Sequence, residues 1–351
     1  MRARHVVGPL AALLASPLLT GVAPAGAEDA GAAAQALEYV ALGDSYSSGT
    51  GTRDYLDDGT DCERSARAYP SLLAAARGWS LNLRACSGAT IGDVTASQLS
   101  ALGAGTGRVT ISVGGNDAGF ADVLTECALP AWASDCDAAV DDAQAYVAGP
   151  LPGALGTLYD RVRTAAPNAR VTVVGYPRVF MGEDCNAGTF FSPSEQTRLN
   201  QTADQLNTRL SAAASGRGFA FANPTSAFTG HAVCDDVEWL NGLSNPVGES
   251  YHPNVAGHRD GYTPVVGGVT PSTSAVAAAR ASADEQAARQ RRYAARDAGI
   301  EPRPFIAPDL DSPAVRRAAR EAGVDLSDPK SVRRADRRYS WAQARDRRDL
   351  R

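Results

Sequence analysis

The sequence has few of the residues that several kinds of functional site need. Its 351 residues include only four histidines, and no two of its six cysteines have C-x-x-C spacing, which argues against a zinc site. Aromatic residues make up only 7% of the chain and show no grouping typical of a sugar-binding platform. Beyond the N-terminal region, no segment is long and apolar enough to span a membrane. We therefore expect no metal, no cofactor and no internal membrane helix.

The N-terminal segment has the pattern of a secretory signal. Two arginines precede an apolar stretch over residues 6–22, and residues 25–27, Ala-Gly-Ala, resemble a cleavage site. Prolines interrupt the stretch, which is shorter than the ~20 residues of a spanning helix. We expect residues 1–27 to be a signal peptide, residues 28–36 to begin the mature chain, and the protein to be secreted and extracellular.

The cysteines agree with export. An even number of cysteines in an oxidising compartment favours disulfides, and six cysteines allow about 15 pairings, so the sequence alone does not choose among them. With 44% apolar residues, the chain is also able to form a substantial core. The cysteines are Cys62, Cys86, Cys127, Cys136, Cys185 and Cys234.

Segments typical of strands alternate with segments typical of helices. This alternation predicts a parallel sheet with helices on both faces. A capping box with proline in its first turn, SPSE at residues 192–195, is a specific signal for the start of a helix. The first predicted strand ends at Leu42, and the others cover residues 81–86, 108–113, 169–175 and 218–222. The other predicted helices cover residues 69–77, 118–127 and 155–165.

Ser45 follows the first predicted strand, in a glycine-rich turn within YVALGDSYSSGTG at residues 39–51. Open parallel sheets bind ligands at the carboxyl ends of their strands, which makes Ser45 a candidate nucleophile. The serines of this turn are equally able to cap a helix, so the residues alone leave both interpretations open. The strand exits at residues 87–88 and 114–117 are expected on the same edge of the sheet.

Four short motifs resemble the blocks of the SGNH (GDSL) hydrolases, in the family's order. They are GDSYSSG with Ser45, CSGAT with Gly88, VGGND with Asn116 and SYHPN with His252. The resemblance covers a domain at residues 37–269 and implies an α/β fold, a flavodoxin-like three-layer α/β/α sandwich with a mainly parallel five-stranded sheet. It also implies a carboxylic ester hydrolase similar to secreted bacterial lipases and esterases.

By this resemblance, Ser45 is the nucleophile and His252 its general base. The main-chain N–H groups of Ser45 and Gly88 and the side-chain amide of Asn116 would form the oxyanion hole. Without the family pattern, Gly88 and Asn116 would be read as ordinary turn residues. Two other histidines remain in the expected mature chain. We expect His231 to be a polar surface residue, and His258 to be structural or exposed.

The group that orients His252 has two candidates, because the family often has aspartate three residues before the histidine and this chain has Glu249. We expect a dyad oriented by the main-chain carbonyl of Ser250, with Glu249 as the alternative. Asp44 and Asp117 are interpreted as turn-stabilising. The resemblance also implies the disulfides Cys62–Cys86, Cys127–Cys136 and Cys185–Cys234.

Residues 270–351 form an arginine-rich extension outside the resemblance. Residues 271–351 contain 18 arginines and lysines against 12 aspartates and glutamates, with few apolar residues and several prolines. Such a composition predicts a solvated extension that is partly helical or disordered. An electrostatic attachment of this extension to an anionic surface is a second interpretation; a nucleic-acid partner is not expected.

Three functions are consistent with these motifs. The first is a lipase or esterase acting on small-molecule or lipid acyl esters, and the second is a carbohydrate acetyl esterase with the same site. The third, a non-catalytic binding protein on this fold, is disfavoured because all four block residues are present. The protein is expected to work as a monomer.

Overall fold

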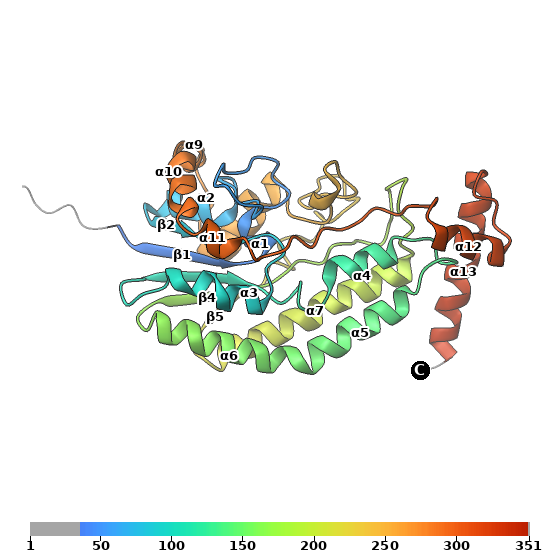
Figure 1. The fold of residues 1–351 in the computed structure, drawn as a ribbon, viewed down its shortest axis with the longest axis horizontal. Coiled ribbons are helices and arrows are strands. Elements are labelled where there is room, and N and C mark those ends of the chain that lie inside the picture. Colours follow the sequence, from blue (N-terminus) through green and yellow to red (C-terminus); the bar gives the residue numbers. More distant parts are fainter. Residues whose placement is uncertain (1–35, 350–351) are drawn as a thin grey trace, which may run out of the picture. The chain divides into compact units, whose positions relative to one another are not determined.

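Five parallel strands form a single sheet at the centre of the chain (Figure 1). The structure is a computed structural model that describes residues 36–349, so the predicted signal peptide and nearly all of residues 28–36 lie outside the described part. The strand order is β2-β1-β3-β4-β5, and every neighbouring pair is parallel, which confirms the predicted fold class. The strands are β1 (Glu38–Gly43), β2 (Ser80–Leu83), β3 (Arg108–Ser112), β4 (Arg170–Val174) and β5 (Ala220–Ala222).

The central strands are buried on both faces. Residues 39–42 of β1 are fully buried, and β1 pairs with β3 so that Gly43 lies opposite Ser112 at the carboxyl ends. This register places the turns after β1 and β3 side by side. The edge of the sheet that carries Ser45 therefore also carries the turn that contains Asn116.

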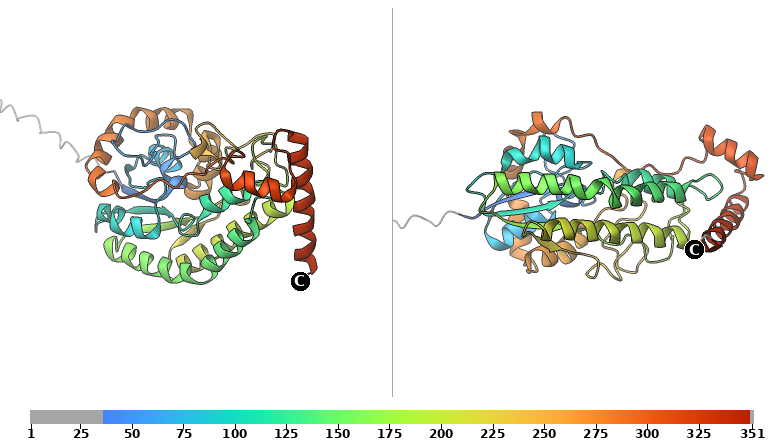
Figure 2. Two further views of the ribbon diagram at one scale, coloured as in Figure 1. Left: turned by 45° about the vertical axis from the view of Figure 1, so that its right-hand side comes forward. Right: turned by 90° about the horizontal axis from the view of Figure 1, so that it is seen from below.

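Helices cover the two faces of the sheet in the arrangement expected for a three-layer sandwich (Figures 1 and 2). One layer contains α3 (Ile91–Ala96), α4 (Phe120–Cys127), α5 (Cys136–Ala148), α6 (Pro150–Ala165) and α7 (Pro193–Ser215). The other contains α2 (Tyr69–Arg77), α8 (Thr263–Gly267), α9 (Thr273–Ala281) and α10 (Ala283–Arg291). Among the described helices, none is long and apolar enough to cross a membrane.

Local sequence signals account for several helix boundaries. The predicted bounds of α2 are confirmed: proline lies in its first turn, and Gly78 ends it with a left-handed φ of 66°. Both hydrogen bonds of the capping box at Ser192 and Glu195 are present at the start of α7. Helix α6 begins at Pro150, five residues before the prediction, because prolines in a first turn need no intrahelical hydrogen bond.

Three disulfides join the chain, and they have the pairings that the family resemblance implied. They are Cys62–Cys86, Cys127–Cys136 and Cys185–Cys234, and the described residues contain no free cysteine.

The C-terminal extension is more helical and more buried than its composition suggested. After α9 and α10 it forms α11 (Ala294–Asp297), α12 (Pro313–Ala322) and α13 (Pro329–Asp349). Many of its described side chains are exposed, in agreement with a solvated and partly helical extension, but Gln290, Asp297 and Phe305 are buried. The reason is that charged and apolar side chains of the extension contact residues far away in the sequence, such as Arg64, Arg84 and Tyr251, and the local sequence gives no sign of these partners.

Candidate active site

Ser45 begins the short helix α1 (Ser45–Ser48), directly after β1. The N-cap of this helix is Asp44, whose side chain accepts a hydrogen bond from the main-chain N–H of Tyr46 at 3.1 Å. Gly49 closes the turn with a left-handed φ of 112°. The capping role is thus filled by Asp44, which leaves the Ser45 hydroxyl available for another partner.

The Asp44 side chain also contacts residues of neighbouring strands and turns. Its carboxylate accepts hydrogen bonds from Ser112 Oγ of β3 at 3.1 Å and from Tyr176 OH, which follows β4. Burial raises the pKa of the Asp44 carboxyl to about 7, against the opposing effect of its hydrogen bonds. These contacts agree with the interpretation of Asp44 as a turn-stabilising residue.

A continuous hydrogen-bonded series runs from Ser45 through the ring of His252. The Nε2 atom of His252 lies 2.8 Å from Ser45 Oγ, and Nδ1 lies 3.0 Å from the main-chain oxygen of Ser250. A carbonyl only accepts, so Nδ1 carries a proton and Nε2 is left as the acceptor for the serine hydroxyl. Burial lowers the pKa of His252 to about 4, although the hydrogen bond to Ser250 favours the protonated ring.

Glu249 is engaged elsewhere. Its buried carboxylate accepts hydrogen bonds from Arg53 Nε at 3.0 Å and from Tyr55 OH at 2.6 Å. The hydrogen bond of the His252 ring is made with Ser250. Of the two predicted orienting groups, the structure brings the Ser250 carbonyl to His252 and turns the Glu249 carboxylate toward Arg53.

Tyr46 links the helix of Ser45 to the loop of His252. Its hydroxyl donates a hydrogen bond to the main-chain oxygen of Tyr251 at 2.7 Å, and its ring lies 5.3 Å from the His252 ring. Tyr251 has a left-handed φ of 65°, a costly conformation for a residue with a bulky side chain. Sequence reasoning missed this role, although the position of Tyr46 beside Ser45 in the motif was the available signal.

The main-chain N–H groups of Ser45 and Gly88 have no hydrogen-bond acceptor among the described residues. Gly88 adopts a left-handed φ of 79°. The side-chain amide of Asn116 donates one hydrogen bond to the main-chain oxygen of Ala89 at 3.0 Å. A second N–H of this amide remains, because a primary amide carries two donors.

Ser45, His252 and Asn116 line one pocket, and its walls are mostly apolar. Side chains of α4, α5 and α7 form these walls, which suits a hydrocarbon chain better than a hydrated polar group. One charged residue of the C-terminal extension, Arg303, also lines this pocket, and no sequence signal pointed to it. The apolar lining includes Phe120, Val123, Ala143, Val147, Leu199, Ala203 and Leu206.

The other two histidines of the described residues, His231 and His258, lie outside this pocket. His258 is fully buried in a π-helical turn, Gly257–Tyr262, and its Nδ1 accepts a hydrogen bond from the main-chain N–H of Tyr69 at 3.3 Å. The half-buried ring of His231 stacks on Trp239, with 3.8 Å between ring centroids. Both rings have structural contacts.

Asp117 caps a neighbouring helix. Its carboxylate accepts hydrogen bonds from the main-chain N–H of Ile91, the first residue of α3, at 3.1 Å. This contact agrees with a turn-stabilising role. Among the described residues, the one group with metal-ligand geometry is Cys185, Cys234 and Glu238, and both of its sulfurs belong to a disulfide.

Comparison with known proteins gives the same family as the motifs. Residues 41–259 match the GDSL-like lipase/acylhydrolase family. The chain is 45% identical over 273 residues to Lipase 1 of Streptomyces coelicolor, covering 76% of this chain and 99% of that protein. It is 41% identical over 272 residues to a lipase of Streptomyces rimosus, covering 77% of this chain and all of that protein.

Solved structures of similar sequence lead to the same family. The extracellular lipase of Streptomyces rimosus superimposes with a TM-score of 0.63 at 42% identity, covering 67% of this chain and 100% of the lipase. Phospholipase A1 of Streptomyces albidoflavus gives a TM-score of 0.63 at 44% identity, covering 66% of this chain and 99% of that enzyme. With the motifs, the fold and these relatives in agreement, the chain belongs to the GDSL-like lipase/acylhydrolase family and is an ester hydrolase.

Proposed function

We propose that the protein is a secreted serine hydrolase of the lipase/esterase type, which cleaves carboxylic esters of apolar acyl groups. Ser45 is its nucleophile and His252 its general base. The observation that carries this proposal is the series of Ser45 Oγ, the His252 ring and the Ser250 carbonyl, at 2.8 and 3.0 Å, beside an apolar pocket.

In the first half of the reaction, Ser45 Oγ attacks the ester carbonyl carbon while its proton passes to Nε2 of His252. The protonated ring then gives this proton to the departing alcohol, and an acyl-serine ester remains. In the second half, His252 takes a proton from water, whose oxygen attacks the acyl carbon. The bond between this carbon and Ser45 Oγ then breaks, Oγ takes the proton back from Nε2 of His252, and the carboxylic acid leaves. The Ser250 carbonyl holds the Nδ1 proton throughout, so Nε2 faces Ser45 in both halves.

Negative charge develops on the carbonyl oxygen in both tetrahedral intermediates. We assign its stabilisation to the N–H groups of Ser45 and Gly88 and to the side-chain amide of Asn116. The proposal is supported by the absence of an acceptor for the two main-chain groups among the described residues. Each such donor in other hydrolases contributes roughly 3 to 4 kcal/mol to the transition state.

The pocket favours an acyl chain over a sugar acetate. Its lining from α4, α5 and α7 is apolar, and such walls gain free energy from hydrocarbon but leave sugar hydroxyls without partners. The proposal of a secreted protein is supported by three disulfides and by the N-terminal signal pattern. The monomeric state stays a prediction.

Hydrolysis of p-nitrophenyl esters of graded chain length, beside acetylated xylan, tests the substrate class. We expect turnover of the esters, with kcat/KM higher for medium chains than for acetate, and no release of acetate from xylan. Ser45→Ala should abolish turnover while leaving the circular dichroism spectrum and melting temperature unchanged. A serine-directed phosphonate should label Ser45 in peptide mapping; turnover by Ser45→Ala, or labelling of another serine, would refute the assignment.

A further inference from the structure

The chain between α11 and α12 passes over the candidate active site. Residues 300–308, which we call the crossing segment, have no regular secondary structure and connect two separately packed parts of the extension (Figure 1). Phe305 is buried in this segment, and its ring packs edge-on against Tyr251 with 4.9 Å between ring centroids. Tyr251 is the residue before His252, so the crossing segment contacts the loop that carries the proposed base.

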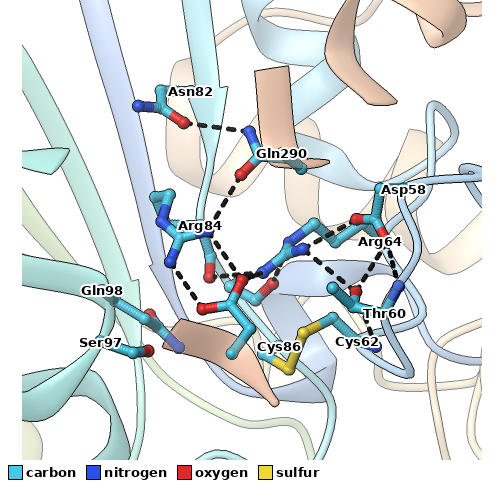
Figure 3. Close-up of polar contacts among 12 residues, drawn as sticks. Asp58, Thr60, Cys62, Arg64, Asn82, Arg84, Cys86, Ser97, Gln98 and Gln290 are labelled. Atoms are coloured by element: carbon cyan, nitrogen blue, oxygen red, sulfur yellow. Dashed lines mark hydrogen bonds and ion pairs between the residues drawn. A yellow bond between two sulfur atoms is a disulfide. The ribbon is translucent and has the colours of Figure 1, made fainter. Parts of the chain in front are cut away.

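A buried ion cluster fixes the chain just before the crossing segment. The carboxylate of Asp297 lies 2.7 Å from Arg64 NH2 and 2.6 Å from Arg84 NH2, and these three side chains are fully buried. Arg84 also donates to Gln290 of α10, and Arg64 to Asp58 (Figure 3). A buried charge that loses its partner is strongly destabilised, so this cluster holds the beginning of the crossing segment in one position.

A second contact fixes the chain after the crossing segment. Helices α12 and α13 form a small apolar cluster around Trp132, which includes Val315 and Val332. The main-chain N–H of Ala131 also donates to Asp336 Oδ1 at 2.9 Å. The crossing segment is therefore held at both ends on the hydrolase domain.

Between these ends, the crossing segment lies directly on the proposed oxyanion-hole glycine. A Cβ atom added to Gly88 would lie 2.3 Å from the main-chain oxygen of Glu301 and 3.0 Å from the N atom of Arg303. Such a close approach leaves no space for a side chain at residue 88. This packing holds Arg303 at the pocket of Ser45 and His252, which it lines.

The charge of Arg303 has no partner at this position. Within residues 36–349, no carboxylate lies within ion-pair distance of its guanidinium, and the side chain is exposed. The nearby acids are used elsewhere: Asp44 accepts three hydrogen bonds and Asp117 caps α3. Burial raises the pKa of the Asp117 carboxyl, and the positive charge of Arg303 acts in the opposite direction.

An unpaired arginine beside an apolar pocket is suited to one kind of substrate. The apolar walls take a hydrocarbon chain, while the guanidinium provides up to five donors for an anion. We propose that Arg303 is a specificity-determining residue that binds an anionic group, a phosphodiester or a carboxylate, carried a few bonds from the scissile ester. The family match ends at residue 259, so this feature belongs to the extension of this chain.

This inference rests on the proposed function, and its test uses three esters with identical short acyl chains. They are a neutral diacylglycerol, its hemisuccinate, which carries a carboxylate, and the corresponding phosphatidylglycerol, which carries a phosphodiester. All three are assayed below the concentration at which they form micelles. The measured quantity is the ratio of kcat/KM for each charged ester to kcat/KM for the neutral one.

Arg303→Gln removes the charge with little change of size, and Arg303→Lys retains it. The matched control is Arg292→Gln, because Arg292 is an exposed arginine of the same extension that does not line the pocket. We expect Arg303→Gln to lower the ratio about tenfold, the scale of one lost charge-assisted hydrogen bond. Arg303→Lys should lower it less, and the control should leave it unchanged.

The salt dependence of this ratio distinguishes a bound charge from a structural role of Arg303, because a structural role would not make the ratio depend on salt. The wild-type ratio should fall as sodium chloride increases from about 0.02 to 0.5 M, because salt screens an exposed charge, whereas the ratio of Arg303→Gln should be insensitive to salt. The charged ester with the larger loss identifies the anion. A change below about twofold for both charged esters would overturn the inference while leaving the proposed function intact. If wild-type enzyme cleaves none of the three esters, the proposed function fails and the inference with it.

Discussion

Substitution of Asp297 by asparagine tests how strongly the extension is bound to the hydrolase domain. Asp297 is buried between Arg64 and Arg84, and its carboxylate accepts hydrogen bonds from both. Arg64 keeps Asp58 as a second partner, whereas Arg84 keeps only the neutral Gln290 and the ring of Tyr293, 4.0 Å from its guanidinium. The variant therefore leaves one positive charge buried without a counter-charge.

The expected loss of stability follows from this uncompensated charge. Removing one partner of a buried ion pair costs about 3 to 5 kcal/mol. With about 2.1 cal/mol/K of unfolding entropy per residue, a folded part of this size would lose roughly 5 to 8 °C in melting temperature. Asp160→Asn is the matched control, because its ion pair with Arg217 is exposed and contributes little.

Differential scanning calorimetry at pH 7 measures both variants. Burial opposes ionisation of Asp297, but Arg84 and Arg64 outweigh it and lower the pKa of this carboxyl below its ordinary value. Its contribution to stability is therefore present above about pH 4 and is lost as the pH falls through the folded pKa. The difference between wild type and Asp297→Asn should shrink in that acidic range. A melting temperature within about 1 °C of wild type at pH 7 would refute the assigned role of the cluster.

Three further predictions concern the active site and the disulfides. Glu249→Gln should lower kcat less than about tenfold, which is under ~1.4 kcal/mol of activation free energy, because the Ser250 carbonyl orients the His252 ring. His252→Ala should lower kcat nearly as much as Ser45→Ala. A large loss of kcat in a folded Glu249→Gln variant would indicate a full triad. Since the pKa of His252 is lowered to about 4, kcat/KM should stay level from neutral pH down to about pH 5 and fall as the ring is protonated near pH 4; an acid limb centred near pH 6.5 would contradict this. Non-reducing peptide mapping should find three bridges and no free thiol, and reduction should lower the melting temperature, because each bridge contributes ~2 to 4 kcal/mol.

The sheet and the candidate site were predictable because their signals are local or occur in a fixed order. Strand β3 contains three successive β-branched residues at 109–111, and α2 has proline in its first turn and glycine at its end. Ser45, Gly88, Asn116 and His252 each follow recognisable motifs in turns, and parallel strands bring such turns to one edge of the sheet.

The packing of the extension was not predictable in the same way. Asp297 and its arginine partners are more than two hundred residues apart in sequence, and charged residues ordinarily indicate solvent. Phe305 begins a group of only three apolar residues, 305–307, between two prolines, without the periodicity that marks a buried face. The electrostatic attachment of this extension to an anionic surface stays a prediction.

The hydrogen bond from Tyr46 to Tyr251 has a consequence for motion at the active site. Tyr46 is covalently attached to Ser45, and Tyr251 to His252, so a single hydrogen bond of 2.7 Å connects the neighbours of the two proposed catalytic residues. These pairs come from parts of the chain 205 residues apart. We therefore expect a displacement of the His252 loop to move α1 with it, which would keep the Ser45 hydroxyl within hydrogen-bonding distance of the imidazole.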